Sequence, residues 1–234
     1  MAKVVTLPNI LITNDDGWDA PGLAALKTLA RRLGQVQVVA PREPHSYAGH
    51  RVTTDGPLTL AETAPREFSL TGTPADCVRV ALTTLFPETG WVLAGINRGG
   101  NLGADIFTSG TVAAVREAAL LGRPGIAVSQ YIRRNVPLNW DRSIELALPV
   151  IQQLMAEPRD GRGYWNLNLP HLDPGQSAET IRCDPDSEPL DVRFRRDGAH
   201  FHYDGSYQAR ARTPGRDVHR CFGGSITVSW LPLG

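Results

Sequence analysis

The sequence predicts an α/β fold in which a mostly parallel β-sheet is covered by helices on both faces and is followed by a β-rich C-terminal extension. Short apolar runs alternate with segments of about 10–15 residues that have helical periodicity, which is typical of βαβ units. The chain has 234 residues, enough for one sizeable core. From about His171 onward, Pro, Gly and Asp become frequent and helical periodicity disappears. We therefore expect one domain over 1–234, with a body at 1–170 and the extension at 171–234.

The strands of the body are predicted from short apolar runs bounded by turn residues. The first begins at Ile10 and ends at two adjacent acids. The others are expected at 36–40, 91–96, 125–129 and 165–169, with short extended pieces at 51–59 and 68–71. In the extension, alternating apolar residues predict strands at 201–203 and 225–230.

Four helices are predicted between these strands. Apolar residues at helical spacing place the first at 20–33, where Gly34 stops it. Thr73 is a plausible N-cap for a helix over 74–86, because Pro74 would then occupy the first helical position. The remaining two are expected at 111–121, before Gly122, and at 141–155.

Composition excludes several classes of protein. Lys+Arg and Asp+Glu both number 24, so the chain lacks the basic excess of a protein that holds nucleic acid through its phosphates. No apolar run reaches 18 residues, and the N-terminal stretch has the character of a strand rather than a signal peptide. Cys77, Cys183 and Cys221 show no disulfide or metal spacing, which indicates reduced thiols in the cytoplasm.

Asp15 and Asp16 are the strongest chemical signal in the chain. They follow the first strand, and ligands of open parallel sheets bind outside the carboxyl ends of the strands. Two adjacent carboxylates repel each other there, and a hard cation such as Mg²⁺ or Mn²⁺ would offset both charges. The alternative is structural: an N-cap Asp followed by an Asp-Gly turn.

Two further oxygen donors are expected at the same edge of the sheet. Ser46 lies in the polar loop after the second strand, and Asn97 directly follows the strand at 91–96. If these strands are parallel, both side chains join Asp15 and Asp16 in an oxygen-only set suited to Mg²⁺, Mn²⁺ or Ca²⁺. Taken singly, Ser46 fits a turn hydroxyl and Asn97 a left-handed turn residue equally well.

A glycine-rich loop at 99–103, followed by Ser109-Gly110-Thr111 and a helix, indicates an anion site. Backbone N–H groups at a helix N-terminus bind anions, and the helix dipole adds to the attraction. Ser109 and Thr111 could instead be plain N-caps. The sequence has neither a dinucleotide-binding Gly-x-Gly-x-x-Gly nor a P-loop lysine motif. A cation that faces an anion site predicts phosphate chemistry.

Several motifs together suggest a family. In order along the chain, they are Ile-Leu-Ile-Thr-Asn-Asp-Asp-Gly (10–17), Ala-Pro-Gly-Leu (20–23), Val-Val-Ala-Pro (38–41) with Ser46 and Gly49-His50, Gly-Thr-Pro-Ala-Asp-Cys-Val (72–78), Gly-Ile-Asn-Arg-Gly-Gly-Asn-Leu-Gly-Ala-Asp (95–105) and Ser-Gly-Thr-Val-Ala-Ala (109–114), with weaker matches at 166–170 and 225–227. With these motifs the chain resembles the SurE survival-protein family of metal-dependent 5′/3′-nucleotidases.

The resemblance implies specific roles. It makes Asp15, Asp16, Ser46 and Asn97 the ligands of one divalent metal ion per subunit (Mg²⁺ or Mn²⁺), with Asp15 and Asp16 also catalytic. It implies that Asn101, Ser109, Gly110 and Thr111 contact the phosphate. It further implies a Rossmann-like body. The implied activities are hydrolysis of nucleoside monophosphates and exopolyphosphatase activity. The implied assembly is a homodimer or homotetramer with an exchanged C-terminal hairpin. The loop at 42–46 departs from the family, which usually has another Arg or Asn-Arg just before the Ser.

Two alternative functions fit the sequence less well. An aspartyl-phosphate phosphatase of the haloacid dehalogenase type expects Asp-x-Asp after the first strand, a pattern that Gly17 and Trp18 break. A non-catalytic nucleotide-sensing module would leave two bare carboxylates beside a phosphate site. No nucleic-acid or membrane partner is expected. The base preference and the attacking group (a water molecule or an Asp) stay open.

The C-terminal segment 200–234 predicts a homo-oligomer. An isolated two-stranded β-hairpin is only marginally stable in water. Phe201, Tyr203, Phe222 and Trp230 would expose apolar surface on a monomer, and such surface usually marks an interface.

Overall fold

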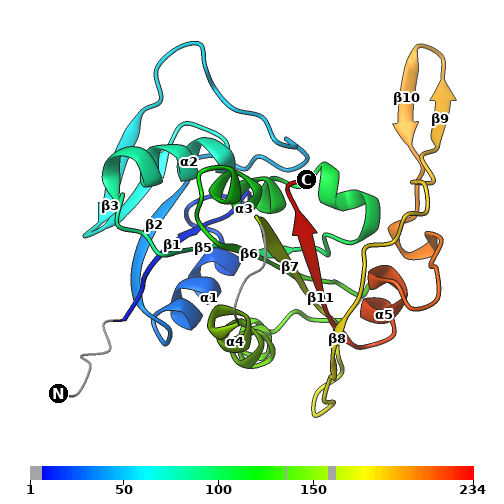
Figure 1. Cartoon of the computed structure of the whole chain (residues 1–234). Helices are drawn as coiled ribbons and strands as arrows, with labels where there is room; N and C mark the ends of the chain where they lie inside the picture. The colour runs from blue at the N-terminus through cyan, green and yellow to red at the C-terminus, as the bar shows by residue number, and fades with distance from the viewer. Residues whose placement is uncertain (1–6, 135, 158–161) are drawn as a thin grey trace.

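The computed structural model describes residues 7–134, 136–157 and 162–234, and it confirms the predicted α/β architecture. Nine strands form one mostly parallel sheet in the order β3-β4-β2-β1-β5-β6-β7-β11-β8 (Figure 1). The N-terminal residues that bear on the signal-peptide expectation, 1–6, lie outside the described residues.

The strands and helices have the following bounds. The strands of the main sheet are β1 Asn9–Thr13, β2 Gln35–Pro41, β3 Leu60–Ala64, β4 Glu67–Leu70, β5 Trp91–Arg98, β6 Gly125–Gln130, β7 Gly163–Leu169, β8 Thr180–Arg182 and β11 Ile226–Pro232. A separate hairpin consists of β9 Phe194–Asp197 and β10 His200–Tyr203. The α-helices are α1 Pro21–Ala30, α2 Pro74–Val80, α3 Gly110–Leu120, α4 Trp140–Ala156 and α5 Asp217–Phe222.

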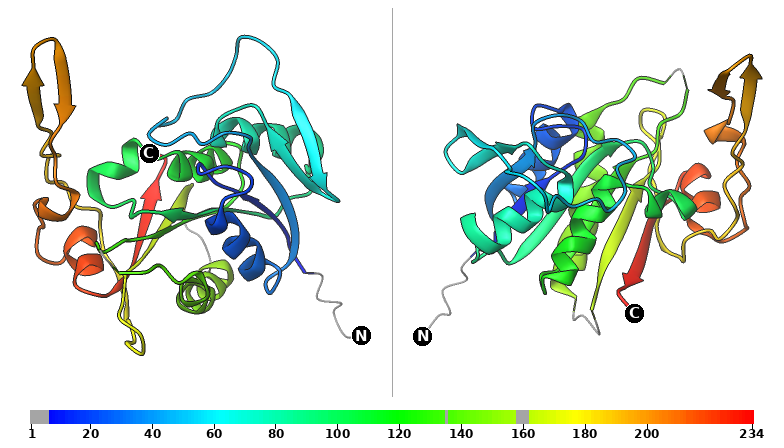
Figure 2. Two further views of the ribbon diagram at one scale, coloured as in Figure 1. Left: turned by 180° about the vertical axis from the view of Figure 1, so that it is seen from behind. Right: turned by 90° about the horizontal axis from the view of Figure 1, so that it is seen from above.

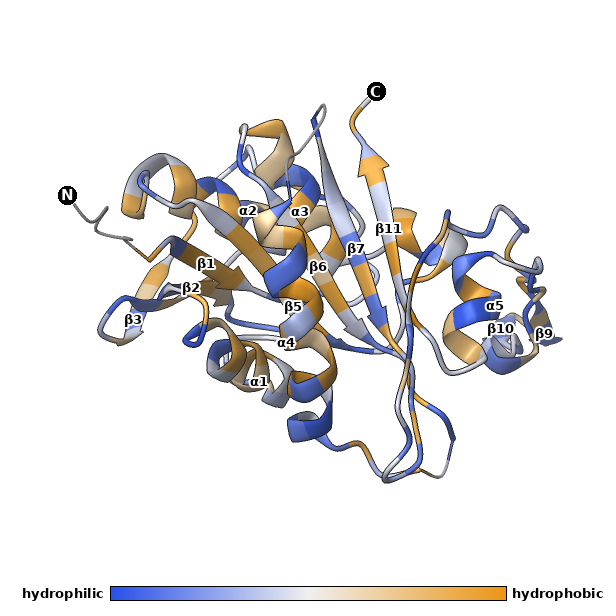
Figure 3. Ribbon diagram, turned by 60° about the horizontal axis from the view of Figure 1, so that its bottom comes forward, coloured by the Kyte–Doolittle hydropathy of each residue, from blue (hydrophilic) through white to orange (hydrophobic). Residues whose placement is uncertain are grey.

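Side chains of each central strand alternate between two hydrophobic cores. In β1, Ile10 and Ile12 pack with α1 and α4, whereas Leu11 packs with α2 and α3 on the opposite face. The alternation follows from the two-residue period of a strand, and helices on both faces explain why the whole run is apolar. Figure 2 shows the two helical layers from behind and from above, and Figure 3 shows the hydrophobic strands between them.

Three strands at the centre of the sheet position the predicted site. β1 pairs in parallel with β2 on one side and with β5 on the other. The carboxyl ends of these three strands therefore meet at the same edge of the sheet. This neighbour relation is the condition on which the oxygen-donor prediction depended.

The extension differs from its predicted form in three respects. Its last strand, β11, joins the main sheet, antiparallel to β7 and parallel to β8. It also contains α5, which was not predicted because six residues are too few for a clear helical period. Of the four aromatic residues expected to be exposed, Phe222 instead stacks on Tyr131 at 4.2 Å and Trp230 packs on Trp165 at 4.7 Å between ring centroids.

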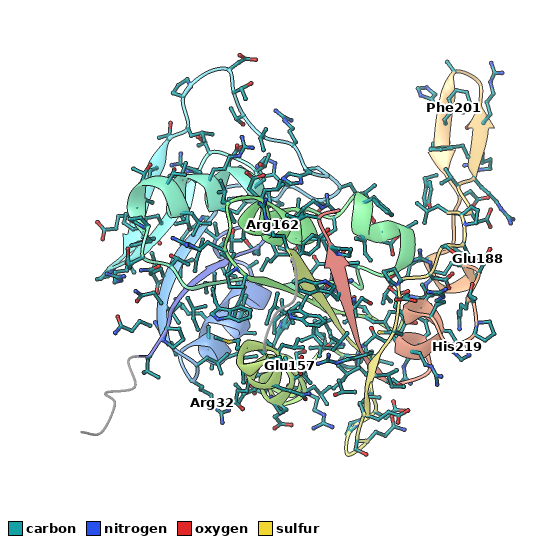
Figure 4. All side chains as sticks on the ribbon, in the orientation of Figure 1. Arg32, Glu157, Arg162, Glu188, Phe201 and His219 are labelled. Atoms are coloured by element: carbon teal, nitrogen blue, oxygen red, sulfur yellow. The ribbon has the colours of Figure 1, made fainter. Side chains whose placement is uncertain are left out.

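The β9–β10 hairpin stands away from the body in the views of Figures 1 and 2. Every residue of both strands is exposed, including Phe201, which Figure 4 labels near the tip. Phe201 and Tyr203 are each 64% exposed, as predicted.

Two smaller predictions for the body were inaccurate. The extended piece at 51–59 forms no strand, because the Asp55-Gly56-Pro57 turn interrupts it, and β3 begins only at Leu60. The helix predicted over 74–86 starts at Pro74 but changes after Val80 into a π-helical turn over Ala81–Leu85. None of the helices in the described ranges is long and apolar enough to cross a membrane.

Candidate functional site

Asp15 lies at the carboxyl end of β1, where its side chain is almost completely buried at 6% exposure. Its Oδ1 accepts a hydrogen bond from the Thr111 hydroxyl at 2.5 Å. Burial raises the pKa of Asp15 to about 6; the Thr111 hydrogen bond opposes this rise, and the neighbouring Asp16 charge adds to it. The protein therefore maintains a carboxylate in a place where its charge is poorly solvated, which is typical of functional sites.

Gly110 is the reason that α3 can begin so close to Asp15. A Cβ added to Gly110 would lie 2.9 Å from the Asp15 Cβ and 3.0 Å from its Oδ2. Any other residue would push the carboxylate away from the helix N-terminus. The glycine in Ser109-Gly110-Thr111 therefore allows Asp15 to contact the first turn of α3 directly.

Asp16, which follows β1, contacts the carboxyl end of β5, where Asn97 lies. The Asp16 Oδ2 accepts a hydrogen bond from the Arg98 N–H at 3.3 Å, next to Asn97. The Asn97 amide nitrogen donates to the Gly99 carbonyl at 2.8 Å. Within the described residues, the Asn97 Oδ1 accepts no hydrogen bond, so this oxygen is available to coordinate a metal ion.

The loop that carries Ser46 is anchored beside Asp15. The His45 N–H donates to the Asp15 carbonyl at 2.8 Å, and the Gly49 N–H donates to the Thr108 carbonyl at 3.1 Å. Ser46 lies between these two anchors and is exposed. The two backbone contacts thus hold the loop that carries Ser46 next to Asp15, at the carboxyl end of β1.

A side-chain hydrogen bond secures the end of this loop. His50 Nε2 lies 2.7 Å from Glu117 Oε2, and Arg79 Nε donates to the other oxygen of Glu117 at 2.6 Å. Burial raises the pKa of Glu117, but the hydrogen bonds from His50 and Arg79 outweigh burial and hold it below its usual value. Glu117 is on α3, so the same helix supports both Asp15 and the Ser46 loop.

The predicted phosphate-contacting residues lie in two places. Ser109 is the N-cap of α3, and its Oγ accepts a hydrogen bond from the Val112 N–H at 3.1 Å. Gly110 and Thr111 form the first turn of the same helix. Together they form a helix N-terminus that could receive an anion directly beside Asp15.

Asn101 is at the centre of a buried amide network. Its amide nitrogen donates to the Ser129 hydroxyl at 2.8 Å, and its backbone N–H donates to the Asn168 Oδ1 at 2.8 Å. The Asn166 and Asn168 amides both donate to the Asn101 carbonyl, at 2.8 and 3.1 Å. These contacts connect the glycine-rich loop to β6 and β7, so Asn101 fixes the position of that loop.

Residues 207–217 hold the glycine-rich loop from the other side, which no sequence signal predicted. Tyr207 donates from its hydroxyl to the Gly100 carbonyl at 3.1 Å, and Asp217 Oδ2 accepts from the Gly103 N–H at 2.9 Å. Arg210 forms a partly buried ion pair with Asp105, whose carbonyl accepts from the Ser109 N–H at 3.0 Å. We call Tyr207, Arg210 and Asp217 the C-terminal clamp.

The four predicted ligands are few, and all of them offer oxygen atoms. No group of three or more His, Cys, Asp or Glu side chains in the described residues could hold a metal ion. Asp15 and Asp16 supply only two carboxylates, and the other two predicted donors are the hydroxyl and amide oxygens of Ser46 and Asn97. Four oxygens with two negative charges suit Mg²⁺ or Mn²⁺ and are poor ligands for a thiolate-seeking metal.

Comparison with known proteins gives a consistent result. The family model described as "Survival protein SurE" matches residues 10–186. A Nostoc sp. protein named "Putative 5′-nucleotidase" is 44% identical over 223 residues, covering 95% of this chain and 98% of the relative. A protein named "5′-nucleotidase SurE" from Paramagnetospirillum magneticum is 36% identical over 95% of this chain and 88% of its own length.

A solved structure shares the fold. The crystal structure of the SurE protein from Aquifex aeolicus superposes with a TM-score of 0.87, at 29% identity, and the match covers 97% of this chain and 94% of that one. The similarity therefore includes the extension as well as the body.

Proposed function

The chain belongs to the SurE survival-protein family, and from this premise we propose that it is a 5′-nucleotidase that hydrolyses nucleoside monophosphates with one Mg²⁺ or Mn²⁺ ion per subunit. One observation carries the proposal: the buried Asp15 carboxylate contacts the first turn of α3 at Gly110 and Thr111. An acid next to a helix N-terminus suits a cation and a phosphate bound side by side.

The residues that would hold the metal are Asp15, Asp16, Ser46 and Asn97. Their fit to a hard cation rests on the oxygen-only donor set and on the raised pKa of Asp15, since a cation would favour its ionised form. When bound, the ion would polarise a phosphoryl oxygen and offset the charge that develops during phosphate transfer.

The chain's own groups would bind and orient the phosphate. The N-terminus of α3 would face the phosphate, where the helix dipole favours negative charge. Ser109 would remain the N-cap, since its Oγ accepts from the Val112 N–H. The Thr111 hydroxyl holds the Asp15 carboxylate in one orientation. Such contacts recognise a terminal phosphate rather than a particular sugar position, so we include 3′-nucleotides and short polyphosphates among the proposed substrates.

An activity panel with controlled metal content tests this function. We expect purified protein to release phosphate from nucleoside 5′-monophosphates, to lose that activity in excess EDTA, and to regain it with Mn²⁺ or Mg²⁺. Full activity in EDTA would refute the metal assignment. Absence of phosphate release from every nucleotide with either metal would refute the enzymatic function.

We also propose that the protein is a homodimer or homotetramer joined through the β9–β10 hairpin. Both strands are exposed and stand away from the body, and a two-stranded hairpin alone is marginal in water. Light scattering of the full chain should give a mass above that of a monomer, and Phe201→Ser with Tyr203→Ser should lower it. A monomeric wild type would refute this proposal.

A cytoplasmic location completes the proposal. Cys77, Cys183 and Cys221 are free thiols, as expected in a reducing compartment. Fractionation of cells that express the tagged full-length chain would test this, and recovery outside the cytoplasmic fraction would contradict it.

A further inference from the structure

Tyr47 and Phe107 have the most exposed large hydrophobic side chains of the described residues. Tyr47 is 89% exposed and Phe107 is 76% exposed. Neither ring forms a hydrogen bond or a ring contact with another described residue. Aromatic side chains bring the largest apolar areas to binding surfaces, so two unpartnered rings need an explanation.

Both rings lie on the loops that carry the candidate site. Tyr47 directly follows Ser46, and Phe107 ends the short 3₁₀ helix Gly103–Phe107, which leads to Ser109. The two loops are joined by the hydrogen bond from the Gly49 N–H to the Thr108 carbonyl at 3.1 Å. Tyr47 and Phe107 therefore lie on two loops that are joined to each other beside Ser46 and Ser109.

The backbone holds Tyr47 in a defined place. Its turn is fixed before it by the contact from His45 to Asp15, and after it by the contacts of Gly49 and His50. Tyr47 itself has φ of 59°, in the left-handed region that bulky residues rarely adopt. Such conformations gather at ligand-binding sites, where the surroundings impose them. An anchored turn that presents a solvent-exposed ring is a preorganised stacking surface.

We propose that Tyr47 and Phe107 form a base-binding subsite that stacks on the nucleobase of the substrate while its phosphate lies at α3. This inference rests on the nucleotidase function proposed above. Every base has a π-face, so stacking tolerates many bases. The expected substrates are therefore nucleotides of broad base identity, with purines favoured over pyrimidines because of their larger rings. Loop side chains, and not the sheet, set this preference.

A comparison of two phosphate esters isolates the base. AMP and ribose 5-phosphate share the sugar phosphate, and only AMP carries a base. In Tyr47→Ala and Phe107→Ala, we expect KM for AMP to rise at least about fivefold relative to KM for ribose 5-phosphate. Loss of one base–aromatic stacking contact weakens binding by at least about this factor. Tyr47→Phe should restore the wild-type ratio, because it keeps the ring.

Leu120→Ala is the matched control, since Leu120 is also exposed, at 49%, but lies at the far end of α3. It should leave both KM values at the wild-type level. An unchanged ratio in both aromatic variants would overturn the inference. So would a fall in oligomer mass by light scattering in Tyr47→Ala, which would assign these rings to a subunit contact. A wild type inactive on both esters would instead refute the nucleotidase function itself.

Discussion

The Asp217 carboxylate accepts a hydrogen bond from the Gly103 N–H at 2.9 Å, although 114 positions separate the two residues. Asp217 is completely buried, and its other oxygen accepts from the N–H groups of Asp186 and Val218, both at 2.7 Å. The loop that leads to Ser109 is therefore fixed by a residue in the extension. The extension therefore contributes directly to the geometry of the candidate site.

Replacing Asp217 with Asn should reduce both stability and catalysis. Whichever way the new amide turns, its NH₂ faces a backbone N–H, and one buried donor loses its acceptor at a cost of about 1–3 kcal/mol. Displacement of the loop should lower kcat/KM at least about tenfold. Thermal unfolding and steady-state kinetics, measured well below Tm, provide the two readings.

Asp184→Asn is the control for this variant, because it keeps the Asp184 backbone carbonyl that accepts from the Asp217 N–H and changes only a side chain that is 82% exposed and forms a surface ion pair with Arg216. It should change neither reading. If Asp217→Asn lowered Tm but kept the wild-type kcat/KM, the clamp would be a structural support without influence on the site.

Asp15→Asn should abolish turnover without destabilising the protein. The variant lacks a charge that would hold the metal, so we expect kcat to fall at least about a hundredfold. Burial raises the pKa of the wild-type carboxyl to about 6, so its ionised form disfavours folding at pH 7. In EDTA, Tm of the variant should therefore equal or exceed that of the wild type. A variant with near wild-type turnover at limiting metal would remove Asp15 from the site.

Asp16→Asn should show the same loss of turnover with a smaller effect on Tm, since Asp16 is less buried than Asp15. The two variants should also lose metal affinity, which isothermal titration with Mn²⁺ measures. Unchanged Mn²⁺ affinity in Asp16→Asn would show that Asp16 is not a ligand.

Gly110→Ala should impair catalysis through Asp15. The added Cβ would approach the Asp15 Cβ to 2.9 Å, so either the carboxylate or the first turn of α3 must move. We expect kcat/KM to fall at least about tenfold. Gly90→Ala is the comparison, because its Cβ would meet the Asn9 carbonyl at an ordinary 3.5 Å. Equal activity of the two variants would argue against close contact at Gly110.

Asp76 should make stability depend on pH in the acid range. It completes the capping box of α2 with Thr73 and accepts hydrogen bonds from the Thr53 N–H and hydroxyl, both at 2.8 Å. Burial raises the pKa of Asp76, but these hydrogen bonds outweigh burial and hold it below its usual value. The stabilisation is thus complete above the unfolded-state pKa of about 3.9 and is lost as pH falls through the folded-state value.

Denaturant unfolding of Asp76→Asn tests this sign. At pH 7 the variant should be less stable than the wild type by about 1–3 kcal/mol. The difference should shrink as pH is lowered below 4. A difference independent of pH would mean that the ionised form of Asp76 is not what the capping box stabilises.

Local patterns were sufficient to predict much of the body. Asp15, Asp16 and Asn97 could be placed at one edge because each follows an apolar run, and parallel neighbours end on the same side of a sheet. Asp217 could not be connected with Gly103 in this way. Its partner is distant in sequence, and the segment between β8 and β11 has too little periodicity to fix its path. The anchoring of Tyr47 likewise depends on contacts that no spacing reveals.

The C-terminal clamp also has a consequence for the time at which activity arises during synthesis. A ribosome adds about 5–20 residues per second. The 114 residues from Gly103 to Asp217 therefore take roughly 6 to 23 s to translate. During this interval the nascent chain already carries Asp15, Asp16, Ser46 and Asn97 but not the residues that immobilise the loop before Ser109. Nucleotide hydrolysis should thus begin only after the chain has been translated beyond Asp217.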